Sequence, residues 1–270
     1  MKQTSAWENE VVQEQIAAWD HWTRLKNQAA KVLYPQATAK RVMLAALRRY
    51  GIPRRSQQRV LEVGFGFGDV VFWFRPPTVL RGVEISPSAL ASATRRAAKR
   101  RHFDAVFSPP CPEDSVRTPF PDGFFDVVLA SHTIEHVYDD SAFLKELLRV
   151  TRPGGVAFIL APLDVVRRSD VLSIAHRRNP AFPDDSFHVW RYNIDTLRSL
   201  AADAGFDVIE ATQCDALSDE RRTMSRPHQI LLSLLWAMAP HSLWRARDRV
   251  SHRRGFLYRQ GLVVASRRRR

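Results

Sequence analysis

Three glycines and an acid, spaced across two predicted strands, could bind a nucleoside. The motif RVLEVGFGFGD carries Gly64, Gly66 and Gly68 directly after a short β-prone apolar run. Because glycine has no Cβ, the backbone there can turn tightly and a ligand can approach it closely. The segment GVEIS, which follows, places Glu84 where the second strand of a Rossmann-type unit ends. A carboxylate at that position offers two oxygens to the two hydroxyl groups of a ribose.

The residues around the glycines decide which nucleoside is expected. A dinucleotide fingerprint needs a third small residue where this chain has Asp69, a poor neighbour for a pyrophosphate. The Gly-Lys-Ser/Thr of a phosphate-binding loop is also missing from the sequence. The spacing is instead G-x-G-x-G preceded by Glu62, which resembles motif I of the class I S-adenosylmethionine-dependent methyltransferases. That cofactor has an ammonium group and a ribose diol but no phosphate, so acids beside the loop favour its binding.

Two later motifs extend the resemblance. The run PFPDGFFDVVLASHTIEHV begins at Pro119, and LKELLRVTRPGGVAFIL occupies residues 144–160. Both are similar to the ubiquinone/menaquinone-biosynthesis type of methyltransferase, a group that acts mostly on small molecules. The resemblance covers about residues 55–212 and 260–266. It implies an α/β, Rossmann-like methyltransferase fold with a mostly parallel seven-stranded sheet and an antiparallel last strand.

Alternating strand and helix patterns supply the frame for these motifs. Helices are expected from Pro87 and over residues 140–150 and 194–204, with a short one from Gly68 toward Arg75. The alternation indicates a mostly parallel sheet that is covered on both faces. Strands are expected at residues 59–63, 79–85, 103–107, 125–130, 156–161, 206–209 and 261–265.

The chain divides into a helical N-terminal cap, residues 1–54, and a methyltransferase domain, residues 55–270. The domain is expected to carry a helical insertion at 213–258, before the last strand, and a basic tail at 267–270. Tryptophans at roughly helical spacing in the cap either cover the substrate pocket, as in the family, or pack on the domain. The longest apolar stretch, residues 230–240, is too short to span a bilayer.

The formal net charge is +13, from 41 Lys and Arg against 28 Asp and Glu. Much of this excess lies at 95–101, 245–254 and 267–270, without the interleaved aromatic residues of single-strand-binding surfaces. A nucleic-acid partner is therefore not expected. Contact with an anionic membrane surface stays open, because arginines follow an apolar helix in the insertion.

The compartment is predicted from cysteine content and from the N-terminus. Two cysteines, Cys111 and Cys214, are too few for a disulfide framework and indicate a reducing environment. The first residues carry no apolar leader of a secretory signal. A cytoplasmic location is expected, with peripheral contact at the inner face of the membrane as the alternative.

The resemblance assigns cofactor-binding roles along the chain. Glu62 would reach the methionine ammonium group, directly or through water; capping of backbone amides at the turn is the alternative, and the full motif favours cofactor binding. Asp114 would accept from the adenine amino group, with a plain loop aspartate as the competing interpretation. Ser131 ends the fourth strand, where the reactive methyl group is expected. The predicted cofactor-binding set is Glu62, Gly64, Phe65, Gly66, Gly68, Glu84, Ile85, Asp114, Ser115 and Ser131.

Three histidines are candidate catalytic residues. An alcohol or phenol acceptor loses a proton on methylation, and imidazole is suited to take it. His132 and His136 belong to SHTIEHV, at the end of the fourth predicted strand, and His188 belongs to FHVWRYN. A hydrogen-bonded structural histidine is the alternative for each of them, and it is the favoured one for His136.

Metal binding is a further alternative for these histidines. Some relatives of the family bind a divalent metal through Glu-x-x-Glu-His and a distant histidine. In this chain His132 replaces the first glutamate, so the set becomes three imidazoles and the carboxylate of Glu135. That set would favour a borderline transition metal over Mg²⁺. Because the pattern is broken, no metal is expected.

These observations predict a single-domain methyltransferase that uses S-adenosylmethionine. The expected reaction is methylation of an oxygen atom in a small molecule, glycan or lipid-linked acceptor. A nucleic-acid (RNA) methyltransferase and a cofactor-binding protein without catalysis are the alternatives.

Overall fold

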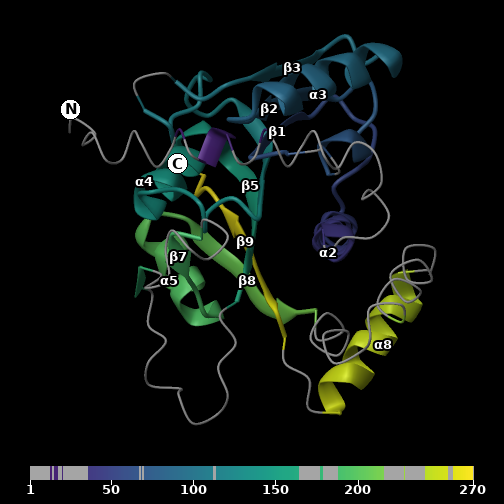
Figure 1. The fold of residues 1–270 in the computed structure, drawn as a ribbon, viewed down its shortest axis with the longest axis vertical. Coiled ribbons are helices and arrows are strands. Elements are labelled where there is room, and N and C mark those ends of the chain that lie inside the picture. The colour runs from purple at the N-terminus through teal and green to yellow at the C-terminus, as the bar shows by residue number, and fades with distance from the viewer. Residues whose placement is uncertain are drawn as a thin grey trace.

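One seven-stranded sheet organises the chain (Figure 1). Its strand order is β3-β2-β1-β4-β5-β9-β8, and the strands are β1 (Arg59–Val63), β2 (Val79–Val83), β3 (Ala105–Ser108), β4 (Phe125–Ser131), β5 (Thr151–Pro162), β8 (Asp207–Cys214) and β9 (Gln260–Ser266). The computed structural model describes residues 13, 15–17, 20, 36–66, 68, 70–111, 114–163, 177–178, 188–215, 228, 241–254 and 258–269.

The strand directions confirm the predicted fold class. β1 runs parallel to both β2 and β4, and the neighbouring pairs β2–β3 and β4–β5 are also parallel. β9 runs antiparallel to both β5 and β8, as expected of the last strand. The helices that the structure describes from end to end are α2 (Gln36–Arg49), α3 (Pro87–Lys99), α4 (Asp140–Val150), α5 (Ile194–Asp203) and α8 (His241–Arg253), with a 3-10 turn η2 (Val71–Trp73).

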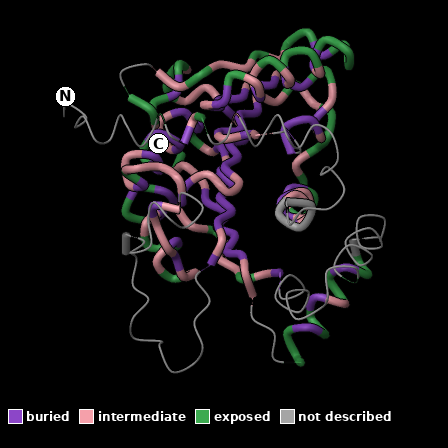
Figure 2. The backbone as a smooth tube through the Cα atoms, in the orientation of Figure 1, coloured by how far each residue is buried: buried purple, intermediate pink, exposed green. Residues whose placement is uncertain are grey.

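Helices cover both faces of the sheet, and the central strands are buried on both sides (Figure 2). In β4, Val127 and Leu129 belong to a core cluster that includes residues of α2 and α3. Their neighbours Val128 and Ala130 belong to a second cluster with residues of α4 and α5. Alternate residues of a strand point to opposite faces, so an unbroken apolar run is what a doubly covered strand requires.

Side-chain caps start the helices that follow the strands. The Ser86 hydroxyl accepts a hydrogen bond from the Ala89 amide at the start of α3, and Pro87 occupies the first turn as predicted. Asp139 caps α4 in the same way. Asn193 and Thr196 form a capping box at the start of α5.

Several element boundaries differ from the sequence prediction. The helix expected from Gly68 toward Arg75 is only the 3-10 turn η2, because the chain is extended again at Phe74 ahead of two prolines. β5 begins at Thr151 rather than at residue 156, with a register shift against β4 that accommodates Gly154 and Gly155. Residues 162–192, for which the sequence predicts no regular element, contain a two-stranded ladder, β6 (Arg177–Arg178) with β7 (Trp190–Arg191).

Other predictions fall partly or wholly on residues outside the described ranges. The cap tryptophans Trp7, Trp19 and Trp22 are among these, as is the apolar run at 230–240. Among the residues described, none of the helices combines the length and the apolar character that a membrane crossing requires. Both cysteines are described, and neither forms a disulfide.

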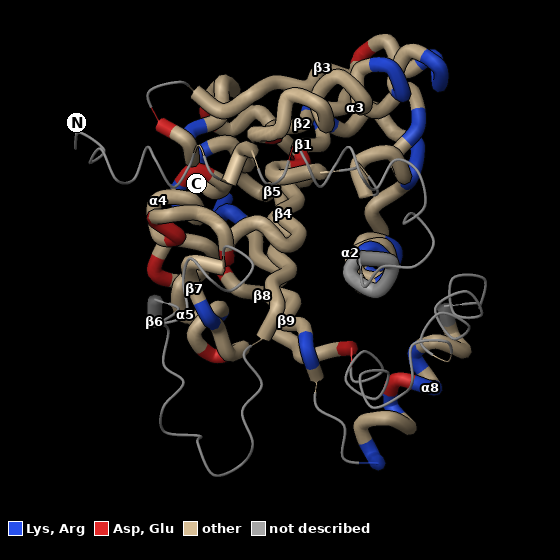
Figure 3. Tube along the Cα trace, in the orientation of Figure 1, with Lys and Arg blue, Asp and Glu red and all other residues tan. Residues whose placement is uncertain are grey.

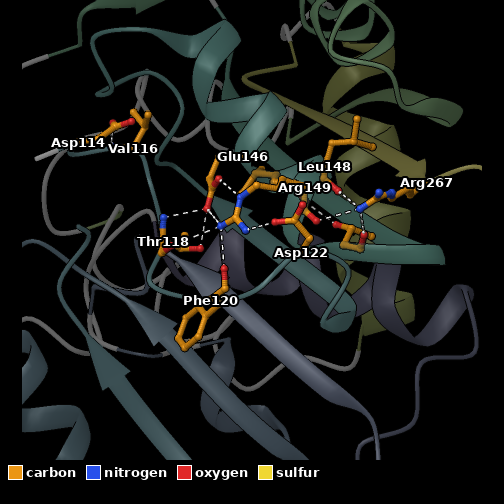
Figure 4. Close-up of polar contacts among 11 residues, drawn as sticks. Asp114, Val116, Thr118, Phe120, Asp122, Glu146, Leu148, Arg149 and Arg267 are labelled. Atoms are coloured by element: carbon orange, nitrogen blue, oxygen red, sulfur yellow. Dashed lines mark hydrogen bonds and ion pairs between the residues drawn. The ribbon is translucent and has the colours of Figure 1, made fainter. Parts of the chain in front are cut away.

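A buried ion pair fixes the loop between β3 and β4 to helix α4 (Figure 4). The Glu146 carboxylate accepts from the Thr118 amide and hydroxyl at 2.8 and 2.7 Å. Arg149 donates to both Glu146 oxygens at 2.7 Å and to the Phe120 carbonyl at 2.8 Å. Glu146 is buried, so these charge-assisted bonds offset the desolvation of its carboxylate.

We predict that Arg149→Met lowers the free energy of unfolding by about 2–4 kcal/mol, because Glu146 would keep a buried charge without its cation. Chemical denaturation measures this change. The matched control is Arg268→Met, which breaks the exposed pair of Arg268 with Asp207 and should have no measurable effect. The double variant Arg149→Met/Glu146→Met should recover part of the loss. If Arg149→Met and Arg268→Met are equally stable, Arg149 does not compensate the buried charge of Glu146.

Candidate functional site

The carboxyl ends of β1, β2 and β4 bring the predicted site residues to one edge of the sheet. Val63 pairs with Val83 on one side and with Ala130 on the other. The Gly64 amide donates to the Val83 carbonyl at 2.8 Å, which places the glycine loop beside the end of β2. This edge is also where the strand order reverses direction, the usual ligand position in open α/β sheets.

All three glycines of the loop have left-handed backbone angles, with φ of 69° at Gly64, 50° at Gly66 and 68° at Gly68. A Cβ on Gly64 would lie 2.3 Å from the Thr133 hydroxyl oxygen, and one on Gly68 would lie 2.6 Å from the Phe72 ring. A Cβ on Gly66 would meet no described atom within 4 Å. Protein packing therefore explains two of these glycines, and Gly66 borders open space.

Glu84 joins the end of β2 to the glycine loop. One of its carboxylate oxygens accepts from the Gly66 amide at 2.7 Å, and the other accepts from the Ile85 and Ser86 amides at 2.8 and 3.1 Å. Burial raises the pKa of Glu84, and these three amides oppose that shift. Since each carboxylate oxygen can accept more than one hydrogen bond, the carboxylate can hold the loop and still accept from a ligand hydroxyl.

Glu62 is buried and accepts from the Val71 amide at 2.6 Å, at the start of η2. It thus makes the backbone-capping contact that was one of its two interpretations, and its role toward an ammonium group stays a prediction. Phe65 is also buried, with its ring centroid 5.1 Å from that of Phe107. The structure therefore gives Phe65 a packing role in the core.

The predicted adenine contact lies on an exposed loop. Asp114 accepts from the Val116 amide at 3.0 Å, which is the geometry of a local aspartate turn. Asp114 and Ser115 are both exposed, whereas Ser131 is half-buried at the end of β4. The contact at Asp114 is the one expected of a loop aspartate, and its adenine role stays a prediction.

The three candidate histidines converge on Glu135, a side chain with no exposed surface. His132 Nδ1 lies 3.3 Å from Glu135 Oε1, and His136 Nε2 lies 3.8 Å from the same oxygen. The rings of His136 and His188 are packed edge to face, with centroids 4.9 Å apart. Sequence reasoning placed Glu135 only in the metal alternative, although the structure puts it at the centre of the cluster.

Backbone hydrogen bonds hold this cluster together. His132 has φ of 53°, an uncommon left-handed angle for a residue with a side chain, directly after β4. The Val189 amide donates to the Glu135 carbonyl at 2.7 Å, which fixes the segment that carries His188. The Thr133 hydroxyl donates to the Val63 carbonyl at 3.0 Å. This bond attaches the histidine turn, residues 132–136, to the end of β1, where the glycine loop begins.

The charges of the cluster reinforce one another. Burial by itself raises the pKa of Glu135, but the surrounding histidines, His132 above all, bring it down to about 2. Burial by itself lowers the pKa of His132, but the carboxylate of Glu135 outweighs it and raises that pKa above its usual range. Glu135 is therefore ionised, and it stabilises a positive charge on His132.

Two residues of the N-terminal segment reach the site, and sequence reasoning missed both. Gln15 donates to the His136 carbonyl at 3.1 Å. Asp20 accepts from the Ser86 hydroxyl at 3.1 Å and from the Ser88 amide at 2.9 Å. Only the helical spacing of the segment was visible in the sequence, and it indicates a buried face without specifying polar contacts.

Residues 61–159 match the methyltransferase domain family. The chain is 25% identical over 195 residues to ajmaline N-methyltransferase of Rauvolfia serpentina, covering 69% of this chain and 62% of that protein. It is 37% identical over 106 residues to the ubiquinone/menaquinone biosynthesis C-methyltransferase UbiE of Geobacter sulfurreducens, covering 38% of this chain and 41% of that protein. The alignments therefore span less than two thirds of either relative.

The fold is similar to the crystal structure of the [4+2]-cyclase SpnF. The TM-score is 0.59 at 17% sequence identity, and the match covers 86% of this chain and 81% of that one. A match at this identity shows the fold alone. Because one fold can host many reactions, the reaction has to be argued from the site.

We predict that replacement by alanine has different effects on stability at Gly64 and at Gly66, the first two glycines of the loop. Gly64→Ala should lower the free energy of unfolding by about 2–5 kcal/mol, because backbone strain adds to the overlap with Thr133. Gly66→Ala should cost only about 1 kcal/mol of backbone strain. Thermal and denaturant unfolding measure both, and Gly64→Ala/Thr133→Ala should recover stability relative to Gly64→Ala. A larger loss at Gly66 than at Gly64 would contradict this account of the loop.

Proposed function

We propose that this chain, which carries a class I S-adenosylmethionine-dependent methyltransferase domain, methylates an oxygen atom of a small-molecule, glycan or lipid-linked acceptor. The observation that carries the proposal is the buried carboxylate of Glu84, which is hydrogen-bonded to the glycine loop at the end of β2. A nucleoside is the kind of ligand that such a loop and such an acid would hold together.

The residues present fit S-adenosylmethionine. Gly66 borders open space, so a ligand can lie against its backbone, and Glu84 would accept from the ribose hydroxyls. Glu62 lies under the same loop and would attract the ammonium group. When bound, the cofactor supplies an electrophilic methyl group on a sulfonium.

His132 is proposed as the base that takes the proton of the acceptor hydroxyl. Its Nδ1 faces Glu135, and this contact favours the tautomer with the proton on Nδ1. Its Nε2 is buried and makes no hydrogen bond to a described group, so it would carry the free electron pair. A proton taken at Nε2 would leave an imidazolium beside a carboxylate, which stabilises that charge.

Positioning and exclusion of water would supply most of the remaining catalysis. The contacts of Gln15 with the histidine turn and of Asp20 with the start of α3 support a covering role for the N-terminal segment. The domain division at residue 54 and the helical insertion at 213–258 stay part of the proposal.

The surface of α8 supports an amphipathic or lipid-linked acceptor. Leu243 and Val250 are 57% and 46% exposed and lie about two turns apart on one side of the helix, and Arg245 and Arg249 are exposed on other sides of it. Trp244, in contrast, is buried in the core. Basic residues on this helix (Figure 3) would attract an anionic membrane surface while the apolar side chains enter it.

The test is transfer of radiolabelled methyl from S-adenosylmethionine by the purified protein into an extract, followed by fractionation. We expect label in small molecules or in the solvent-extractable fraction. Label in nuclease-sensitive polymer would replace the proposal with an RNA methyltransferase. Cofactor binding without any transfer would favour a non-catalytic protein.

We predict that Glu84→Ala raises the dissociation constant for S-adenosylmethionine about 10–100-fold, since a charge-assisted hydrogen bond contributes ~1.5–3 kcal/mol. Isothermal titration calorimetry measures it. The matched control is Glu210→Ala. It removes a carboxylate on β8 that accepts hydrogen bonds from Arg49 and Tyr50. If the two variants bind the cofactor equally well, Glu84 is not the ribose acid.

We predict that His132→Asn lowers kcat about 100-fold or more while the affinity for S-adenosylmethionine stays unchanged. Asparagine tolerates the left-handed angle at this position, so the turn should keep its shape. His252→Asn, on the exposed side of α8, is the control. A variant His132→Asn that turns over at the wild-type rate excludes His132 as the base.

A further inference from the structure

Glu135 is a buried carboxylate that the described residues leave without a hydrogen bond. The side chain has no exposed surface, and neither of its oxygens accepts a hydrogen bond from any group in the described part of the chain. The contact with His132 Nδ1 at 3.3 Å is within ion-pair distance but lacks the alignment of a hydrogen bond. Burying an ionised carboxylate is costly unless a cation or hydrogen-bond donors compensate it.

Imidazole nitrogens surround this carboxylate. One ligand atom from each of Glu135, His136 and His188 lies within 4.8 Å of the others. Tetrahedral zinc sites have bonds of about 2.0–2.1 Å, which place ligand atoms roughly 3.3 Å apart. The Glu135 oxygen is already 3.8 Å from His136 Nε2, so small side-chain rotations would close the set.

We propose that Glu135, His136 and His188 form a binding site for a divalent transition metal of the zinc class. Two imidazoles and one carboxylate are borderline donors, which suit Zn²⁺ or Co²⁺ and are poor for Mg²⁺ and Ca²⁺. His132 faces the same oxygen of Glu135 and is a positioning residue for that ligand. The sequence predicts no metal, because the family's ligand pattern is broken at His132. The proposal differs because the sequence pattern does not show that His188 lies close to Glu135 and His136.

The backbone around the ligands is already fixed, so little ordering would accompany binding. The amides of Val189 and Trp190 both donate to the Glu135 carbonyl, at 2.7 and 3.2 Å. The Trp190 indole donates to the Val137 carbonyl at 3.0 Å, and Gln15 donates to the His136 carbonyl at 3.1 Å. Such supporting bonds hold metal ligands in position in known sites.

Three protein ligands leave a fourth position for a water molecule or a substrate atom. The Thr133 hydroxyl attaches the turn that carries Glu135 and His136 to the end of β1, directly before the glycine loop, so the proposed metal site would lie beside that loop. A role of the fourth position in orienting the acceptor oxygen rests on the proposed methyl transfer. Metal binding itself does not depend on the reaction.

The test is titration of the purified, chelator-treated full chain with Co²⁺, followed by visible absorption. We expect one equivalent to bind with the intense absorption of four-coordinate cobalt, to be displaced by Zn²⁺, and to be unaffected by excess Mg²⁺. A thiolate charge-transfer band in the near ultraviolet would place the metal on Cys111 or Cys214 instead and overturn the proposal. The readout is independent of methyl transfer, so failure of either proposal leaves the other standing.

Substitutions locate the site. His136→Gln, His188→Gln and Glu135→Gln should each weaken Co²⁺ binding about 100-fold or more, whereas His252→Gln on α8 should leave it unchanged. Zn²⁺ should also raise the melting temperature of the wild-type chain and not that of the variants. A cooperative melting transition in each variant shows that the variant is folded. Wild-type affinity in both His136→Gln and His188→Gln, or no binding by the wild-type chain, overturns the proposal.

Discussion

The parallel register of β1 against its two neighbours controls the position of every group in the site. Val63 is opposite Val83 in β2 and opposite Ala130 in β4, so these strands end at the same level. Gly64 directly follows the last residue of β1, and Glu84 directly follows the last residue of β2. The histidine turn directly follows β4. A shift of one residue would send each of these side chains to the opposite face, and both apolar cores would be lost with it. The register that buries the core is therefore the register that assembles the site.

Buried carboxylates fix loops at both edges of the sheet, and they are compensated in different ways. Glu62 and Glu84 accept hydrogen bonds from backbone amides, which fixes the shape of the glycine loop. Glu146 accepts from Thr118 and from Arg149, which fixes the loop after β3. Glu135 differs, because imidazoles surround it without aligned hydrogen bonds. A buried charge that local groups leave undersatisfied is the usual sign that a ligand or a proton is part of the design.

The fold and the glycine loop could be predicted because they depend on local patterns. A strand buried on both faces is a continuous apolar run, and a left-handed turn requires glycine, so β1 and its loop are visible in the sequence. The reason for Gly64 was not visible, because its close neighbour Thr133 is distant in the chain. The meeting of His188 with His136 depends on hydrogen bonds from Val189 and Trp190 to Glu135, and no spacing rule predicts such contacts. Gln15 and Asp20 reach the site for equally non-local reasons.

The contact between Gly64 and Thr133 makes the cofactor loop and the histidine turn one rigid unit. A loop that cannot move away from the turn gives the acceptor side a fixed distance from the cofactor side. Under the proposed methyl transfer, differences in acceptor would then arise in the segments that contact this unit, namely the described residues of the N-terminal segment and the segment around His188. Under that proposal these segments would specify the acceptor, and the rigid unit would bring the methyl group and the acceptor together.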